Sequence, residues 1–121
     1  MAAMVKRPRY DLAAAKRSVI EIGTSCARRA SATLGGNENE ARRHIRKLFK
    51  SLSSSDFAHV ETMPSRGGPP LFGDVYGKRD AYGVWFIKFM YDGTTTTVIM
   101  SCHEAEHPIQ LADGHTLRKS Q

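Results

Sequence analysis

Residues 101–108, Ser-Cys-His-Glu-Ala-Glu-His-Pro, bring together several side chains that could do chemistry. His103, Glu104 and His107 match H-E-x-x-H, a zinc peptidase pattern in which two histidines bind the metal and the glutamate acts as a base. His103, Glu106 and His107 match H-x-x-E-H, a second zinc pattern. A metal-dependent peptidase is therefore the first activity to weigh.

The zinc pattern works on a helix, where four residues rise only about 6 Å. Here the segment continues a strand-like run, and Pro108 disfavours the helical conformation at His107. In a strand the two histidines would lie about 13 Å apart, too far to share an ion with Zn–N bonds of about 2.1 Å. We therefore expect no metal and no cofactor, and a zinc peptidase is the least favoured alternative.

The first half of the chain predicts three helices. Asp11 is a suitable N-cap for a helix over residues 11–21, whose apolar positions are Leu12, Ala15, Val19 and Ile20. A second helix opens at Thr24 or Ser25 and ends at the glycine pair 35–36. Asn37 and Glu40 form a capping-box signature for the third, which has an apolar stripe and a basic side. That basic side can contact phosphate, but an ordinary solvated or partner-binding face is the favoured interpretation.

The second half predicts strands over residues 56–63, 71–77, 82–91 and 94–103. The sequence therefore indicates an α+β fold with three N-terminal helices packed on a C-terminal antiparallel sheet. Asp92-Gly93 predicts a two-residue hairpin turn, so Tyr91 would pair with Thr94, and Tyr82 would lie opposite His103. In this register the core face carries Gly83, Trp85, Ile87, Phe89, Thr96, Val98, Met100 and Cys102. The opposite face carries Tyr82, Val84, Phe86, Lys88, Thr95, Thr97, Ile99, Ser101 and His103.

Length and composition indicate a small basic domain. The 121 residues carry 18 Lys and Arg against 12 Asp and Glu, a net charge of +6, which favours a nucleic acid partner. We expect one domain over residues 1–104, beginning with a loose arm over 1–8, and a polar tail over 105–121. No membrane span or signal peptide is recognisable, and Cys26 and Cys102 suggest buried thiols, so we expect a cytoplasmic protein.

Several segments together resemble a known family. These are Arg9–Leu12, Leu52–Met63 with its Ser-Ser-Asp-Phe, Phe72–Tyr76 with its Asp-Val-Tyr, Phe86–Lys88 and Ser101–Glu104. In this order, with three helices before the segment that begins at Leu52, they resemble the motility quorum-sensing regulator (MqsR) family over roughly residues 6–104. The family consists of RelE-like mRNA interferases, the toxins of type II toxin–antitoxin systems. The resemblance implies a RelE-like fold, endoribonuclease activity on mRNA, and a cognate antitoxin of the DNA-binding helix-turn-helix type. It leaves two alternatives open, cleavage on the ribosome as a further partner and cleavage of free mRNA.

Four positions that the resemblance associates with RNA cleavage differ from the family pattern. Lysines are replaced by His59 and His103, a glutamine by Gly73, and a tyrosine by Phe86. This chain would therefore be a divergent member.

The two histidines suit metal-free RNA cleavage, in which a base activates the 2′-hydroxyl and an acid protonates the leaving oxygen. We predict His59, His103 and Tyr82 as the catalytic residues, with Tyr82 replacing the tyrosine lost at Phe86. Lysines and arginines would contact the phosphate, namely Lys88, Arg66, Lys78 and Arg79. The alternative is a catalytically inactive relative that binds RNA or a protein.

Overall fold

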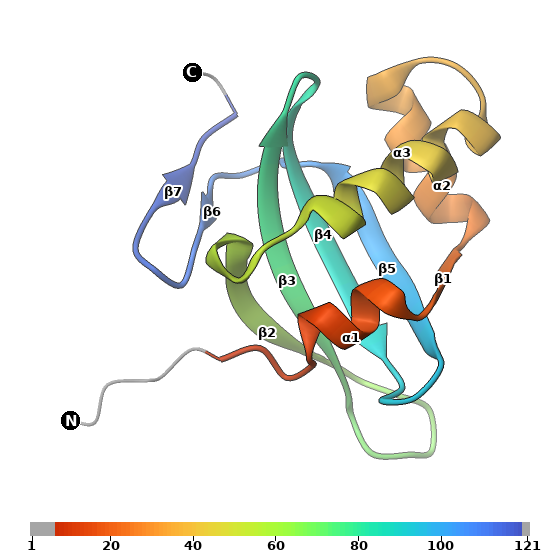
Figure 1. Ribbon diagram of the computed structural model, residues 1–121, viewed down its shortest axis with the longest axis vertical. Coiled ribbons are helices and arrows are strands. Elements are labelled where there is room, and N and C mark those ends of the chain that lie inside the picture. Colours follow the sequence, from red (N-terminus) through yellow and green to blue (C-terminus); the bar gives the residue numbers. More distant parts are fainter. Residues whose placement is uncertain (1–6, 120–121) are drawn as a thin grey trace.

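The computed structural model describes residues 7–119 and has an α+β fold (Figure 1). The helices are α1 (Leu12–Arg17), α2 (Thr24–Leu34) and α3 (Glu38–Ser51), and a 3₁₀ turn, η1, covers Ser54–Asp56. The strands are β1 (Val19–Ile22), β2 (Phe57–Met63), β3 (Leu71–Asp80), β4 (Gly83–Tyr91), β5 (Thr96–Glu104), β6 (Ile109–Gln110) and β7 (Thr116–Leu117). Five of them form a sheet in the order β1-β5-β4-β3-β2, antiparallel except for the β1–β5 pair. The arm predicted for residues 1–8 lies outside the described residues except for Arg7 and Pro8.

Helices α2 and α3 begin and end where the sequence predicts. The carboxylate of Asp11 caps α1 by accepting a hydrogen bond from the Ala14 amide, and Asn37 and Glu40 form a reciprocal capping box on α3. Helix α2 ends at Gly35, whose φ of 74° is in the left-handed region that favours glycine. Local capping chemistry therefore determines these boundaries.

The first helix is shorter than predicted, because residues 19–22 form strand β1. Val19 pairs with Thr96 in parallel register, and the hydroxyl of Ser18 lies 2.7 Å from that of Thr97. Valine and isoleucine suit a strand, and the free edge of β5 supplies backbone partners that a continued helix would forgo. The helices therefore do not all precede the sheet, since β1 lies between α1 and α2.

The connection between β4 and β5 is longer than the predicted two-residue turn. Asp92 accepts hydrogen bonds from the amides of Thr94, Thr95 and Thr96, at 2.8, 2.8 and 3.1 Å. These backbone bonds lower the pKa of the Asp92 carboxyl group. Tyr91 consequently pairs with Thr97 and not with Thr94, and the predicted pairing of Tyr82 with His103 is wrong.

A β-bulge at Met100 changes the register along the hairpin. Beyond the bulge, Phe86 pairs with His103, a shift of four residues from the predicted register. An even shift leaves every side chain on its predicted face, so His103 shares a face with Phe86 and Lys88 as expected. Between the hairpin turn and the bulge, the pairing differs from the predicted register by three residues, an odd number. Thr97 and Ile99 are therefore buried in place of Val98 and Met100.

The main core lies between the three helices and one face of the sheet. Its largest fully buried side chains are Trp85, Tyr76, Phe49, Phe57 and Phe89. Cys26 and Cys102 are both buried there with free thiols, and burial raises the pKa of each. We call this the helical face of the sheet and the other the open face.

The second, smaller core covers one end of the open face. Ala105, Ile109 and Leu111 are buried against Val75 and Val84, so the segment expected to be a polar tail contributes apolar side chains to the sheet. Its β6–β7 hairpin lies beside the sheet in Figure 1. No helix in the described part of the chain is long and apolar enough to cross a membrane.

Asp74 attaches the N-terminal segment to the sheet. It is fully buried, and its two carboxylate oxygens accept hydrogen bonds from the backbone amides of Arg9 and Tyr10, at 2.8 and 2.9 Å. Burial raises its pKa, against the opposing effect of these bonds. The segment before α1 is thus held by this carboxylate, together with a hydrogen bond from the Tyr10 hydroxyl to the Phe72 carbonyl oxygen.

We predict that Asp74→Ala lowers the free energy of unfolding by about 2–3 kcal/mol, because two partly buried hydrogen bonds lose their acceptor. Asp74→Asn should cost less, since its carbonyl oxygen replaces one acceptor. Urea denaturation measures both changes, and Glu21→Ala, at an exposed position of β1, is the control. An Asp74→Ala variant as stable as the parent would contradict this role.

Candidate active site

Polar side chains from three strands project onto the open face. β2 contributes His59 and Glu61, β4 contributes Lys88, and β5 contributes His103. Strand β3 runs between them and places Gly73, Val75 and Gly77 on the same face. Because a glycine has no side chain, β3 forms a low floor across which groups from its neighbours can approach one another.

Lys88 crosses this floor to reach Glu61. Its Nζ lies 3.2 Å from Glu61 Oε1, and a Cβ placed at Gly73 would lie only 2.8 Å from Lys88 Cγ. Any larger residue at position 73 would therefore block the path of the lysine side chain. Gly73 therefore permits the ion pair between Glu61 of β2 and Lys88 of β4.

Glu61 also contacts His59, so three charged or titratable groups form one chain. His59 Nε2 lies 3.0 Å from Glu61 Oε2, and the Lys88 side chain is only 17% exposed. Partial burial acts to raise the pKa of Glu61, but hydrogen bonds from His59 and Lys88 outweigh it and hold the pKa below its ordinary value. The carboxylate is thus ionised near neutral pH and positions both neighbours.

His103 is held in a different way. Its ring stacks on Phe86, with centroids 5.1 Å apart and an interplanar angle of 17°. Its Nδ1 lies 2.9 Å from the Glu104 carbonyl oxygen, which can only accept a hydrogen bond. Nδ1 is therefore the protonated nitrogen, and in the neutral ring Nε2 carries the lone pair.

A pocket joins the two histidines. It has a volume of about 430 Å³ and is lined by His59, Phe86, His103 and residues 105–110. The two histidines come from strands separated by β3 and β4, yet they face the same hollow. Both imidazoles therefore line one hollow on the open face.

The C-terminal hairpin forms the remaining wall of this pocket. It packs on the sheet at Gly77, where an added Cβ would lie 3.0 Å from Ile109 Cγ2 and 3.1 Å from Leu117 Cδ1. Arg29 of α2 holds the same segment through a salt bridge to Glu106. Residues 105–110, from the segment expected to be a polar tail, thus complete the site.

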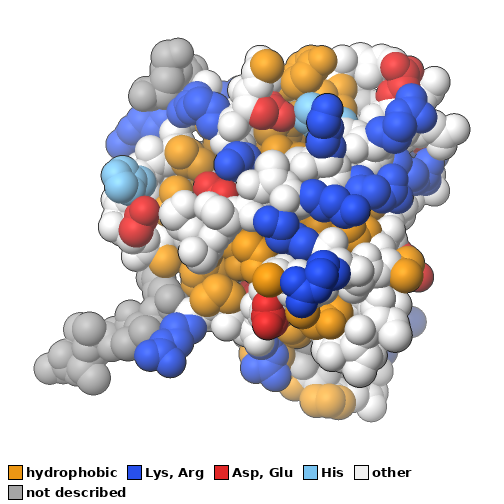
Figure 2. All heavy atoms as spheres, viewed as in Figure 1, with side chains coloured by type: hydrophobic (Ala, Val, Ile, Leu, Met, Phe, Trp, Pro, Cys, Tyr) orange, Lys and Arg blue, Asp and Glu red, His pale blue; other side chains and the backbone are white. Residues whose placement is uncertain are grey.

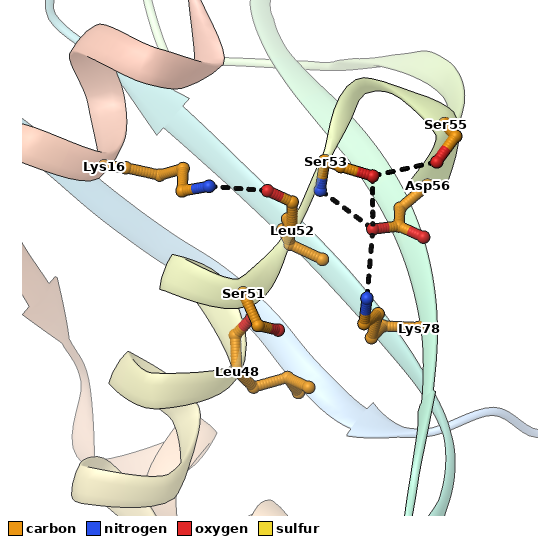
Figure 3. A network of polar contacts seen from close by, with 8 residues as sticks. All are labelled: Lys16, Leu48, Ser51, Leu52, Ser53, Ser55, Asp56 and Lys78. Carbon is orange, nitrogen blue, oxygen red and sulfur yellow. Dashed lines mark hydrogen bonds and ion pairs between the residues drawn. The ribbon is translucent and has the colours of Figure 1, made fainter.

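The other residues predicted for the site lie elsewhere. Tyr82 is in the β3–β4 turn, 54% exposed, with its ring edge-on to His44. Lys78 lies on the helical face 3.5 Å from Asp56, which also accepts hydrogen bonds from the amide and hydroxyl of Ser53 (Figure 3). Of the predicted catalytic residues, the structure brings together only His59 and His103.

The two arginines are also apart from the pocket. Arg79 donates a hydrogen bond to the Arg118 carbonyl oxygen, and Arg66 is exposed in the loop between β2 and β3. Lys88 is the predicted phosphate ligand that lies close to His59, through their shared contact with Glu61. Glu61 was missed, although its position two residues after His59 on a strand predicts a shared face.

The zinc pattern is not on a helix. His103 and Glu104 end strand β5, and His107 is exposed in the turn that follows. Within residues 7–119 no group of three or more His, Cys, Asp and Glu side chains is arranged to hold a metal ion. The titratable side chains that line the pocket are those of His59, His103, Glu106 and His107.

No family model matches the chain, and no curated protein or solved structure matches it either.

We predict that Gly77→Val displaces the β6–β7 hairpin, because the added side chain would overlap Ile109 and Leu117. Cleavage after Glu104 or Glu106 by a glutamate-specific protease, followed by intact-mass spectrometry, should become markedly faster. Gly23→Ala is the control, since nothing lies within 4 Å of its added Cβ. Unchanged cleavage of the Gly77→Val variant would show that the hairpin does not depend on this contact.

Proposed function

We propose that this chain is a metal-independent endoribonuclease that cleaves mRNA, the toxin of a type II toxin–antitoxin system with a RelE/MqsR-like fold. The observation that carries the proposal is the pocket shared by His59 and His103, with Lys88 held nearby. The net charge of +6 and the resemblance of residues 6–104 to the MqsR family support it. In this proposal a cognate antitoxin keeps the protein inactive, and the cytoplasm is its location.

The proposed reaction is transesterification within the RNA. The lone pair of His103 Nε2 takes the proton of the 2′-hydroxyl, and the 2′-oxygen attacks the phosphorus. The bond from phosphorus to the 5′-oxygen breaks, and protonated His59 gives its proton to that oxygen. The products are a 2′,3′-cyclic phosphate and a 5′-hydroxyl. Lys88 would stabilise the negative charge on the phosphorane.

We assign roles to two further residues, Phe86 in the pocket and Glu61 beside it. Phe86, stacked on His103, fixes the plane of the imidazole and offers an apolar wall to a base. Glu61 touches both His59 and Lys88, so it would act as a positioning residue for the acid and the phosphate ligand.

A second candidate function is that of a catalytically inactive relative that binds RNA or a protein partner. It is favoured by the neutralisation of Lys88 by Glu61, and by the loss of polar groups at Gly73 and Phe86 relative to the family pattern. The two candidates differ in whether purified protein breaks an RNA chain.

We predict that the purified protein cleaves RNA in excess EDTA and leaves 2′,3′-cyclic phosphate ends. His59→Ala and His103→Ala should each lower the rate by about 10²–10⁴-fold, the usual range for loss of an acid or base. His115→Ala, at an exposed position outside the pocket, is the matched control and should keep full activity.

Intact RNA after incubation with folded protein, together with normal growth of cells that express the chain without its neighbouring reading frame, would favour the inactive relative. Cleavage only in the presence of ribosomes would retain the proposal and add a partner. Cleavage that survives both histidine substitutions would place the active site elsewhere.

We predict a split effect for Glu61→Gln. The value of kcat should fall by about tenfold, because His59 and Lys88 lose their shared anion, whereas KM for RNA should not rise, because one negative charge is removed beside the phosphate ligand. Glu61→Asp should restore part of kcat. A higher KM with unchanged kcat would instead indicate that Glu61 binds the substrate directly.

A further inference from the structure

Helix α3 carries a row of cations on the side of the molecule opposite the candidate active site. Arg43, Arg46, Lys47 and Lys50 are all exposed and recur at i, i+3, i+4 and i+7, which places them on one side of the helix over about 10.5 Å. None of them has an ion-pair partner among residues 7–119. Figure 2 shows Lys and Arg side chains gathered over this helical side of the molecule.

The row carries an electrostatic cost within the helix. Arg43 and Lys47 are four residues apart, as are Arg46 and Lys50, and like charges at this spacing destabilise a helix. A solvated helix commonly alternates such cations with glutamates, whereas residues 41–55 contain no acidic residue. The arrangement is thus unfavourable for the isolated protein and favourable for one bound to a polyanion.

An exposed aromatic ring lies beside this row. Tyr82 lines a hollow of about 430 Å³ together with Arg43, His44 and Lys47. A second hollow of about 240 Å³ continues between Lys47, Ser51 and Tyr82. The surface therefore combines cations, an exposed aromatic ring and two neighbouring hollows.

Asp80 holds the tyrosine in place. One of its oxygens accepts hydrogen bonds from the Tyr82 amide and from the Trp85 indole, both at 2.8 Å. Its other oxygen lies 2.8 Å from His44 Nε2, and the Tyr82 ring packs edge-on to that imidazole, with centroids 5.2 Å apart. The backbone of Tyr82 is thus held by Asp80 and its ring packs against His44 before any ligand arrives, which lowers the cost of binding.

We infer that this surface is a second RNA-binding site, which takes a single strand with its phosphates along Arg43 and Lys47 and one unpaired base stacked on Tyr82. Cations that follow a phosphate backbone next to an aromatic platform are the usual means of binding single-stranded nucleic acid. The site lies on the helical face and shares no residue with the His59–His103 pocket. It therefore goes beyond the proposed cleavage activity and does not depend on it.

The test uses the full chain and a fluorescent 2′-O-methyl RNA of about 10 nucleotides, a length within the usual site size. This probe has no 2′-hydroxyl and cannot be cleaved by the proposed reaction. In the double variant Arg43→Glu/Lys47→Glu, binding should weaken at least tenfold. The slope of log affinity against log salt should shrink by about 1.4, the value for two lost phosphate contacts on a single strand.

Further variants separate the contributions. Tyr82→Ala should weaken binding about tenfold with an unchanged salt slope, and Tyr82→Phe should bind like the parent, because stacking needs only the ring. Arg17→Glu/Arg118→Glu makes the same change in net charge at exposed positions away from the groove and should have little effect. His59→Ala/His103→Ala should also bind like the parent.

Three results would overturn the inference. If Arg17→Glu/Arg118→Glu weakened RNA binding as much as Arg43→Glu/Lys47→Glu, the effect would be one of net charge and not of this surface. Loss of binding in the histidine variant would place the RNA in the pocket on the open face. Displacement of the probe by poly-glutamate as readily as by unlabelled RNA, with Tyr82→Ala unchanged, would assign the surface to an acidic protein.

Discussion

The open face of the sheet depends on the absence of side chains at two positions of β3. A Cβ at Gly73 would lie 2.8 Å from Lys88, and one at Gly77 would lie 3.0 Å from Ile109. The first gap lets the lysine of β4 reach the glutamate of β2, and the second lets the C-terminal hairpin rest on the sheet. Since β3 lies between β2 and β4, no other strand could provide both approaches. The contacts among His59, Glu61 and Lys88 and the wall of the pocket therefore both depend on the glycines of β3.

Residues 73–77 of β3 also contribute side chains to the opposite, helical face. Between Gly73 and Gly77, the strand period of two directs Asp74 and Tyr76 to the helical face, where both are fully buried. Asp74 there anchors the segment before α1, and Tyr76 packs against Phe57 and Phe89. Five consecutive residues of β3 thus combine a bare surface for the site with an anchor for the core. A register slip of one residue in β3 would exchange these roles.

Much of this fold follows from local patterns, and the errors have physical causes. The capping residues Asn37 and Glu40 act through neighbours in sequence, so the sequence predicts the start of α3. Strand β1 was mistaken for helix because its partner, β5, lies more than seventy residues away in the chain.

The predicted hairpin register was wrong because Asp92 accepts hydrogen bonds from three amides and Met100 forms a bulge, features with no simple sequence signature. His103 stayed on the correct face because the resulting shift was even. Strand periodicity places Glu61 on the face of His59, but its contact with Lys88 and the pocket wall at residues 105–110 depend on long-range packing. The predicted position of Tyr82 opposite His103 was wrong because it followed from the wrong register.

The distribution of charge suggests a division of work between the two faces. In the candidate active site Glu61 offsets Lys88, so the pocket has little positive charge with which to attract RNA from solution. The unpaired cations of the described residues are concentrated on α3 instead. Association with a polyanion depends on the number of phosphates neutralised, whereas cleavage depends on the placement of a few groups around one phosphate. If both proposals hold, a strand captured along α3 would supply the pocket on the opposite face with RNA at a raised local concentration. The pairing of Lys88 with Glu61 would then serve to place the lysine at the reacting phosphate, while the cations of α3 would supply the affinity for RNA.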